Sequence, residues 1–359
     1  MWNKTRITQL LKIKYPIIQG PFGGKFSSVK LVSSVSNLGG MGSFGLNSYS
    51  PEEILEINED IRSQTSNAYA LNIWVPLEDD PADTYTKDEF EEVRNSFSQH
   101  FDNVGATLPD QMLGKERDFE QKIEALLKAS PPVVSFIYGI PPADIISEFK
   151  RRGIVVMAVA TTVNEALMIE KSGLDIVIAS GKEAGGHRAS FLDLPVDINH
   201  LDSTNALVAR IRSKVNIPVI AAGGITTGSD IVKALHAGAD AVQLGTAFLA
   251  TEESNATEEH KAKLLSEDLF ITKLTNVFTG RMARVIETDF VREIDLSYKI
   301  APFPIQSNFL SDLRETAKQQ GNFQYEAFWS GQPSQPIRHK TTSGLFKSLL
   351  HEIDWEHQI

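Results

Sequence analysis

Short apolar runs alternate with helix-like stretches along most of the chain, and this alternation restricts the possible folds more than any other feature. Eight such runs occur, at residues 17–20, 41–45, 68–74, 133–139, 154–160, 175–180, 218–224 and 241–249. Strands that are buried on both faces of a parallel sheet read as continuous apolar runs. Eight alternations of this kind predict an α/β protein with a (β/α)8 TIM barrel rather than an open doubly wound sheet.

The stretches between these runs carry helix start and stop signals. Helices are predicted at residues 28–38, 51–62, 119–129, 144–152, 162–171 and 227–236. Ser50 stands directly before Pro51, the usual arrangement of an N-cap residue and the first helical position. Gly153, Gly173 and Gly238 stand where helix C-caps are expected.

Two regions exceed the minimal barrel repeat. We expect residues 1–250 to form the barrel, with a charged insertion at about 78–117. Residues 251–359 are expected to form a smaller, mainly helical second domain or cap that returns to the barrel. No low-complexity tract or linker separates an independent domain.

Composition disfavours several classes of function. The 359 residues include no cysteine, which removes disulfides, thiolate metal sites and cysteine nucleophiles. The net charge of −11 disfavours nucleic-acid binding, which needs a clustered basic surface. No run approaches the roughly 20 apolar residues of a membrane-spanning helix, and the N-terminus has no signal-type apolar segment. We therefore expect a cytoplasmic protein, and a homo-oligomer is compatible with the sequence.

Glycines concentrate at the predicted C-terminal ends of the strands, where the active site of a TIM barrel lies. Gly185 and Gly186 follow the sixth run, Gly223 and Gly224 end the seventh, and Gly245 lies in the eighth. Loops after strands seven and eight form the recurrent phosphate site of such barrels. A phosphorylated substrate or a mononucleotide cofactor is therefore expected here. In the alternative interpretation, the glycine pair only makes a tight turn before Thr226 and Thr227 cap a helix.

His187 is the main candidate for acid–base chemistry, because it follows the paired glycines at the end of a predicted strand. An imidazole in that place can act as a general base or donate a hydrogen bond to an anion near pH 7. Most loop histidines have no chemical role, and the other seven are interpreted in that way. Asn72 lies near the end of the third run, in Leu71-Asn72-Ile73-Trp74, where its amide can pair with a planar heterocycle.

Several other chemistries lack their motifs. No histidine pair has metal-binding spacing, so no metal site is expected. The chain also has neither a Gly-x-Ser-x-Gly elbow nor a phosphate-binding P-loop. Triad hydrolysis and P-loop chemistry are therefore not supported.

Segments along nearly the whole chain resemble, in order, the motifs of nitronate monooxygenases, formerly called 2-nitropropane dioxygenases. They include Glu183-Ala-Gly-Gly-His-Arg and Pro218-Val-Ile-Ala-Ala-Gly-Gly-Ile. The others are residues 15–24, 35–42, 71–74, 134–139, 243–249, 278–284 and 329–332. Single segments are shared by other flavin barrels, but the ordered set is specific.

The resemblance implies noncovalent FMN at the C-terminal ends of the strands, with its phosphate at Gly224 and residues 243–246. Asn72 and residues 20–22 would lie near the flavin ring, and Gly185 beside the ribityl chain. The expected cofactor-binding residues are Gly20, Pro21, Phe22, Asn72, Ser180, Gly185, Gly186, Gly223, Gly224, Gln243, Leu244, Gly245 and Thr246. His187 corresponds to the family's active-site histidine.

Three positions depart from the family pattern. Ser180 replaces a glutamine that contacts the flavin, so a water or Lys182 is expected to take over that contact. Phe22 would place a flat ring against the flavin or the substrate pocket. Residues 189–191 replace a small glycine.

The activity implied by the resemblance is the oxidation of alkyl nitronates, such as propionate 3-nitronate, by molecular oxygen. The products would be carbonyl compounds and nitrogen oxides, and the partners would be the small anionic nitronate and oxygen. Two alternatives stay open: a flavin-dependent enoyl-acyl-carrier-protein reductase that uses NADH, and a non-catalytic flavin-binding barrel. The sequence does not identify the physiological substrate.

Overall fold

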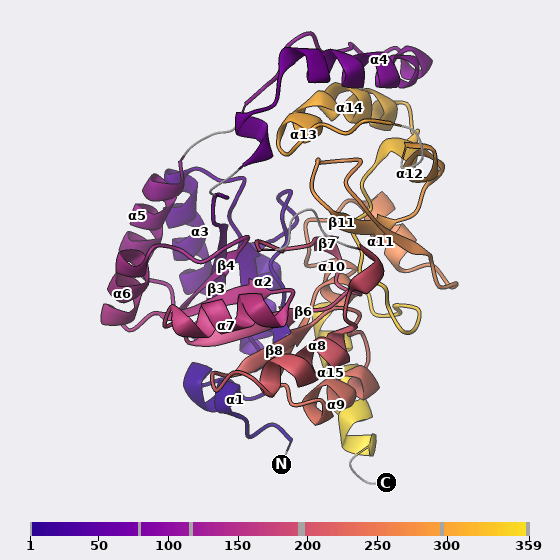
Figure 1. Cartoon of the computed structure of the whole chain (residues 1–359). Helices are drawn as coiled ribbons and strands as arrows, with labels where there is room; N and C mark the ends of the chain where they lie inside the picture. The colour runs from indigo at the N-terminus through magenta and orange to yellow at the C-terminus, as the bar shows by residue number, and fades with distance from the viewer. Residues whose placement is uncertain (1, 78–79, 115–117, 193–197, 295–297, 357–359) are drawn as a thin grey trace.

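Eight parallel strands form a closed barrel in the computed structural model, which describes residues 2–77, 80–114, 118–192, 198–294 and 298–356 (Figure 1). The strands are β1 (Ile17–Gln19), β2 (Gly42–Gly45), β3 (Tyr69–Trp74), β4 (Val133–Ile137), β5 (Val155–Ala160), β6 (Ile176–Ser180), β8 (Val219–Ala222) and β9 (Ala241–Leu244). A parallel bridge between Ile18 and Met41 closes the ring between β1 and β2. The predicted TIM barrel is confirmed, since every predicted run contains one strand.

The eighth run is only half strand, so its predicted extent to residue 249 is wrong. The chain leaves β9 at Gly245 and forms the short helix α10 (Thr246–Leu249). The amides of Phe248 and Leu249 both donate to the carbonyl of Gly245, at 3.0 Å. These hydrogen bonds close a helical turn where a strand was expected.

Helices surround the barrel at the predicted places. They are α2 (Val29–Asn37), α3 (Pro51–Gln64), α5 (Phe119–Ala129), α6 (Ala143–Arg151), α7 (Val163–Lys171), α8 (Thr204–Arg212) and α9 (Gly228–His236). Only α8 has no counterpart among the predictions. The Ser50 side chain accepts from the Glu53 amide at 3.2 Å and so caps α3 as expected. The last helix, α15 (Thr342–Glu356), packs against α9 and α2 and completes the outer layer.

The barrel interior is apolar towards the N-terminal ends of the strands. Met41, Ala70, Val133 and Met157 are buried there in one cluster with Ile7 of α1 (Arg6–Leu11). Helix α1 therefore covers that end of the barrel (Figure 1). The other end is left for the ligand site.

A second hydrophobic core lies above the barrel. It joins Phe97 and Phe101 of α4 (Lys87–Val104), from the insertion, with Phe278 and Phe290 from the C-terminal region. Helices α4 and α14 lie side by side in Figure 1, although they are far apart in the sequence. The other elements are η1 (Pro81–Asp83), η2 (Ile198–His200), α11 (Glu258–Leu264), α12 (Asp289–Ile294), α13 (Ile305–Phe309), α14 (Ser311–Gln319) and η3 (Phe323–Tyr325). Residues 78–79 and 115–117, at the two ends of the predicted insertion, lie outside the described residues.

A small antiparallel sheet joins this upper layer, called the cap below, to the barrel. Its strands are β10 (Thr272–Thr275), β11 (Ala283–Ile286) and the two-residue β7 (Gly186–His187). In the register, His187 lies opposite Ala283. The loop that carries the candidate histidine is thus fixed by a strand from the cap, a contact that no local sequence pattern indicates.

Candidate active site at the barrel mouth

Polar side chains line the mouth of the barrel at the C-terminal ends of the strands. The register pairs Asn72 with Ser135, and Ser180 with Ala222, which in turn pairs with Gln243. Because side chains alternate between the two faces of a strand, these positions share the inward direction. The structure therefore brings Asn72, Ser180 and Gln243 to one mouth.

Asn72 has a fixed orientation at this mouth. Its amide nitrogen donates to the Ser135 hydroxyl at 2.8 Å and to the Ser135 carbonyl at 3.2 Å. The amide donors are thereby used within the protein. The side-chain oxygen is left to accept a hydrogen bond, for which no described residue supplies the donor.

Gln243 is partly buried, and its buried side-chain oxygen is unpaired. Its Oε1 atom has no hydrogen-bond partner among the described residues. Its side chain lies against Gly20, where an added Cβ atom would stand 3.3 Å from Gln243 Cγ. A buried acceptor without a partner costs free energy, and a bound ligand with a donor group would remove that cost.

The end of β9 and the residues after it approach Phe22 and the C-terminal region. A Cβ atom added at Gly245 would lie 3.9 Å from the Phe22 ring, so this ring covers the end of β9. Thr246 Oγ1 accepts from the Gly331 amide at 2.8 Å. Pro21 and Leu244 lie in the same two segments, and the Gly20 amide donates to the Leu244 carbonyl at 2.9 Å.

The loop after β6 packs directly on residues 330–332. A Cβ atom added at Gly185 would stand 2.2 Å from the Gly331 amide nitrogen, so only glycine fits there. The Gln332 amide donates to the Glu183 carbonyl at 2.9 Å. The sequence motifs include residues 329–332, but no local sequence pattern indicates their contact with this loop.

A pocket of about 310 Å³ lies beside the glycine turn after β8. Gly223 and Gly224 both have positive φ, of 123° and 69°, and both line the pocket together with Glu183 and Gln332. Thr227 caps α9 by accepting from the Asp230 amide at 3.1 Å. The alternative interpretation, a tight glycine turn before a capped helix, therefore describes a turn that is present. The same two glycines also line a pocket.

His187 is held on the cap side of the mouth. Its Nε2 atom lies 2.9 Å from Thr279 Oγ1. Aromatic rings surround the imidazole: Trp74 and Trp329 have centroids at 5.3 Å, and Phe303 lies at 6.3 Å. Burial, with a further contribution from the positive charge of Arg281, lowers the pKa of His187 to about 3. The imidazole is therefore neutral at neutral pH.

The hydrogen bonds around Thr279 favour one tautomer of His187. Thr279 Oγ1 lies 3.2 Å from the Arg281 carbonyl, to which only the hydroxyl can donate. If the hydroxyl proton is used there, Thr279 must accept from an Nε2–H of His187. Both contacts are then hydrogen bonds, and His187 Nδ1 carries the lone pair.

The segment after His187 is anchored by a buried carboxylate that the sequence did not single out. Glu165 accepts from the Thr161 amide at 2.6 Å and from the Phe191 amide at 2.7 Å. Arg188 donates to the Thr161 carbonyl at 3.2 Å. Residues 188–191 thus hold the loop in place. Earlier in the same loop, Glu183 accepts hydrogen bonds from both the amide and the hydroxyl of Thr204, each at 2.9 Å.

The described residues contain neither a helix that could cross a membrane nor a group of three or more His, Asp or Glu side chains arranged for a metal ion. The closed barrel and its polar mouth define an enzyme-type (β/α)8 scaffold. The site thus depends on glycine loops, amides and one neutral histidine.

Comparison with known proteins agrees with this class. The family model for nitronate monooxygenase matches residues 4–352. A protein named "Probable nitronate monooxygenase" from Staphylococcus aureus (strain Newman) is 35% identical over 356 residues, covering 99% of this chain and 98% of the relative. The chain belongs to the nitronate monooxygenase family and is an oxidoreductase.

Solved structures show the same fold over the whole chain. A nitroalkane oxidase from Streptomyces ansochromogenes has a TM-score of 0.88 and 33% identity, covering 98% of this chain and 99% of its own. FabK from Thermotoga maritima has a TM-score of 0.73 and 26% identity, covering 99% and 97%.

Proposed function

We propose that this protein oxidises alkyl nitronates, such as propionate 3-nitronate, with molecular oxygen and bound FMN. Carbonyl compounds and nitrogen oxides would be the products. The observation that carries the proposal is the neutral His187, held by Thr279 at 2.9 Å inside an aromatic surround next to the polar barrel mouth. Family membership supports the reaction class.

The residues of the mouth suit FMN. The unpartnered Gln243 Oε1 needs a donor, and Asn72 offers an acceptor for the edge of a planar ring. The phosphate is assigned to the turn of Gly223 and Gly224, where both glycines have positive φ, and to Leu244, Gly245 and Thr246, which follow Gln243 in the chain. Gly20, Pro21, Phe22, Ser180, Gly185 and Gly186 complete the proposed cofactor contacts. When bound, FMN supplies the capacity to take electrons from the nitronate and pass them to oxygen.

The low pKa of His187 favours a substrate that is already deprotonated. A base with a pKa of about 3 removes a carbon-bound proton poorly near pH 7. A nitronate has already lost that proton, whereas a neutral nitroalkane has not. Because Nε2–H is donated to Thr279, His187 can donate to the anionic nitronate only after Nδ1 takes up a proton, which the negative charge of the bound substrate favours.

Oxygen consumption with propionate 3-nitronate tests this function. We expect the FMN-loaded protein to consume oxygen, and the His187→Ala variant to lose about 10²–10³ of kcat/KM, the usual cost of removing one hydrogen-bond donor to an anion. Wild-type activity no higher than that of the variant would overturn the substrate assignment.

The NADH-dependent enoyl-acyl-carrier-protein reductase is the second candidate. The net charge of −11 weakens its encounter with an acidic carrier protein. Rapid anaerobic bleaching of the flavin by NADH would favour this reductase, and a flavin that NADH leaves oxidised would favour the monooxygenase.

The visible spectrum of the purified protein tests the cofactor itself. We expect a flavin spectrum and release of FMN, identified by mass, on denaturation. A colourless protein that takes up no added FMN would contradict both enzyme functions. Bound FMN that neither nitronates nor NADH reduce would indicate a non-catalytic flavin barrel. The cytoplasmic location stays a prediction from the sequence.

A further inference from the structure

The loop after His187 reaches into the barrel. Ala189 is 4% exposed and belongs to the same interior cluster as Met157 and Ile178. On its preceding side, His187 is fixed because β7 pairs with β11. The place of the imidazole therefore also depends on what holds the residues that follow it.

Glu165 is the group that holds this loop. Its side chain is fully buried in the first turn of α7. Oε1 accepts from the Phe191 amide at 2.7 Å and from the Leu192 amide at 3.2 Å. Oε2 accepts from the amide of Thr161 at 2.6 Å and from its hydroxyl at 2.8 Å. The carboxylate thus joins the residue after β5 to the loop of His187.

The hydrogen bonds of Glu165 require two acceptor oxygens. Each oxygen receives at least one backbone amide, which can only donate. Because the Thr161 hydroxyl donates to Oε2, it accepts in turn from the Ser190 hydroxyl, at 2.7 Å. Every proton of this network therefore points towards the carboxylate. A glutamine does not fit in its place, since its NH2 group would face a backbone N–H in either orientation.

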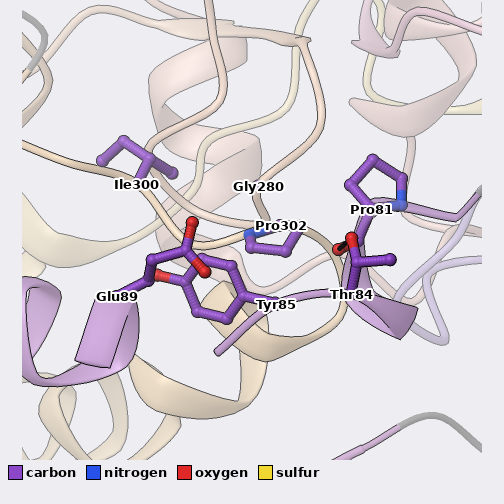
Figure 2. A pocket seen from close by; sticks show the side chains of 7 residues that line it. All are labelled: Pro81, Thr84, Tyr85, Glu89, Gly280, Ile300 and Pro302. Carbon is purple, nitrogen blue, oxygen red and sulfur yellow. Dashed lines mark hydrogen bonds between the residues drawn. The ribbon is translucent and has the colours of Figure 1, made fainter. Parts of the chain in front are cut away.

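The support of His187 from the cap borders a hollow. Thr279, which binds the Nε2 atom of His187, is followed in the chain by Gly280, and Gly280 lines a pocket of about 380 Å³. Pro302 lines the same pocket (Figure 2). Glu165, in contrast, has no exposed surface. The fully packed support of the histidine loop is therefore the one that Glu165 provides.

Helix α7 carries a second carboxylate of this kind near its other end. Glu170 Oε1 accepts from the Asn216 amide at 2.6 Å and from the Ile217 amide at 3.2 Å. These two residues precede β8, so they lie at the N-terminal end of the barrel, opposite the candidate site. Glu170 is thus the matched comparison for Glu165, with the same pair of amide hydrogen bonds and no contact with the histidine loop.

We propose that Glu165 is a positioning residue for His187, acting through residues 188–192. Its carboxylate keeps Ala189 inside the barrel and thereby holds the imidazole at the mouth, next to Thr279. The inference rests on the proposed function and adds a residue on which the place of His187 depends. Misplacing a reacting group by about 1 Å can cost about 100-fold in rate, even when the substituted residue lies away from the chemistry.

Steady-state oxygen consumption by FMN-loaded Glu165→Gln, with a nitronate as substrate, tests the positioning role. We expect kcat/KM to fall about 10- to 100-fold, mainly through kcat, because the imidazole leaves its place relative to the bound substrate. Glu170→Ala loses two amide hydrogen bonds at the other end of the barrel and should keep the wild-type kcat/KM. Equal losses in the two variants, or no loss in Glu165→Gln, would overturn the proposal.

The titration of His187 separates this role from the proposed function, because it needs no turnover. Nuclear magnetic resonance of the FMN-loaded protein, labelled at the histidine ring carbons, follows it, and His187→Gln identifies the signal. In the wild type and in Glu170→Ala the imidazole should stay neutral down to about pH 5. In Glu165→Gln water should reach the imidazole and raise its pKa towards that of a solvated histidine. An unchanged titration in Glu165→Gln would overturn the proposal, whereas this change without nitronate oxidation by the wild type would reject the function and retain the positioning role.

Ser190→Ala tests the same network with a smaller change and serves if Glu165→Gln does not fold. It removes the hydrogen bond from Ser190 to Thr161 and leaves those of Glu165 in place. We expect a loss of about three- to tenfold in kcat/KM and a smaller rise in the pKa of His187. Ser213→Ala removes one side-chain hydrogen bond at the end of α8 and should change neither quantity. Wild-type values for Ser190→Ala in both measurements would overturn the proposal.

Discussion

At the scale of single residues, the candidate site depends on the environment of His187 more than on the histidine itself. The Nε2 atom of His187 lies 2.9 Å from Thr279 Oγ1. The rings of Trp74 and Trp329 lie beside the imidazole, each with its centroid 5.3 Å from that of the imidazole. These contacts remove water from the imidazole and hold it neutral. A histidine in a water-exposed loop would titrate near pH 6.5 and turn freely.

Thr279 is a positioning residue in this account. We expect Thr279→Val to lower kcat/KM for a nitronate about tenfold, because the neutral imidazole loses the hydrogen bond that fixes its tautomer. Thr279→Ser should restore most of the loss, since it keeps the hydroxyl. Steady-state oxygen consumption measures both variants.

Thr288→Val provides the comparison, because Thr288 also donates a side-chain hydrogen bond in the cap, to the Gln324 carbonyl at 3.0 Å. The Thr288→Val variant should keep the wild-type kcat/KM. A serine variant no better than the valine variant would show that the hydroxyl has no positioning role.

At the scale of elements, one strand and one helix from the C-terminal region complete the barrel. Strand β11 pairs with β7 and so fixes the loop of His187. Helix α15 packs between α2 and α9, and Glu352 accepts from the Gly228 amide at 2.7 Å. The chain thus leaves the barrel after β9, builds the cap and returns to cover its own core.

The packing of α15 can be tested with Phe346, which is 1% exposed in the main core. Phe346→Ala should lower the free energy of unfolding by about 3–5 kcal/mol, the usual cost of removing a buried aromatic ring. Denaturant unfolding measures this change.

Leu167→Ala on α7 is the control, because Leu167 is 39% exposed. It should cost less than about 1 kcal/mol. Similar costs for the two variants would contradict the role of α15 as a packed barrel helix.

At the scale of the whole molecule, the folded protein holds several histidines neutral. Burial lowers the pKa of His260 to about 4 and of His187 to about 3, and it also lowers the pKa of His100. In the unfolded chain these groups bind protons below about pH 6.5. Stability therefore falls as the pH drops from about 6.5 towards 4, because only the unfolded state takes up these protons.

Melting temperatures between pH 7.5 and pH 5 measure this linkage. We expect the melting temperature to decrease on acidification. The decrease should be smaller in His260→Gln, because this variant lacks one of the histidines that stay neutral in the folded protein. His339→Gln is the comparison and should keep the wild-type slope. A slope that His260→Gln leaves unchanged would exclude this histidine as a source of the acid sensitivity.

The predictable features of this protein are those that depend on short segments of sequence. The eight strands and six of their helices follow from apolar periodicity and capping residues, because burial on both faces of a parallel strand leaves a continuous apolar run. The predicted end of the eighth strand is wrong, because apolar residues such as Phe248 and Leu249 are compatible with both a strand and the short helix α10. The predicted assignments to FMN remain predictions.

By itself, the sequence determined the barrel, the glycines at its strand ends and the histidine that follows them, because each depends on a short local pattern. Only the tertiary structure decided what surrounds that histidine. Thr279 lies 92 positions from His187, Arg281 stands two residues after Thr279, and Tyr138 and Trp329 come from two further places in the chain. Their meeting depends on β7 pairing with β11 and on the cap core, and long-range packing of this kind leaves no periodic signal in any one segment.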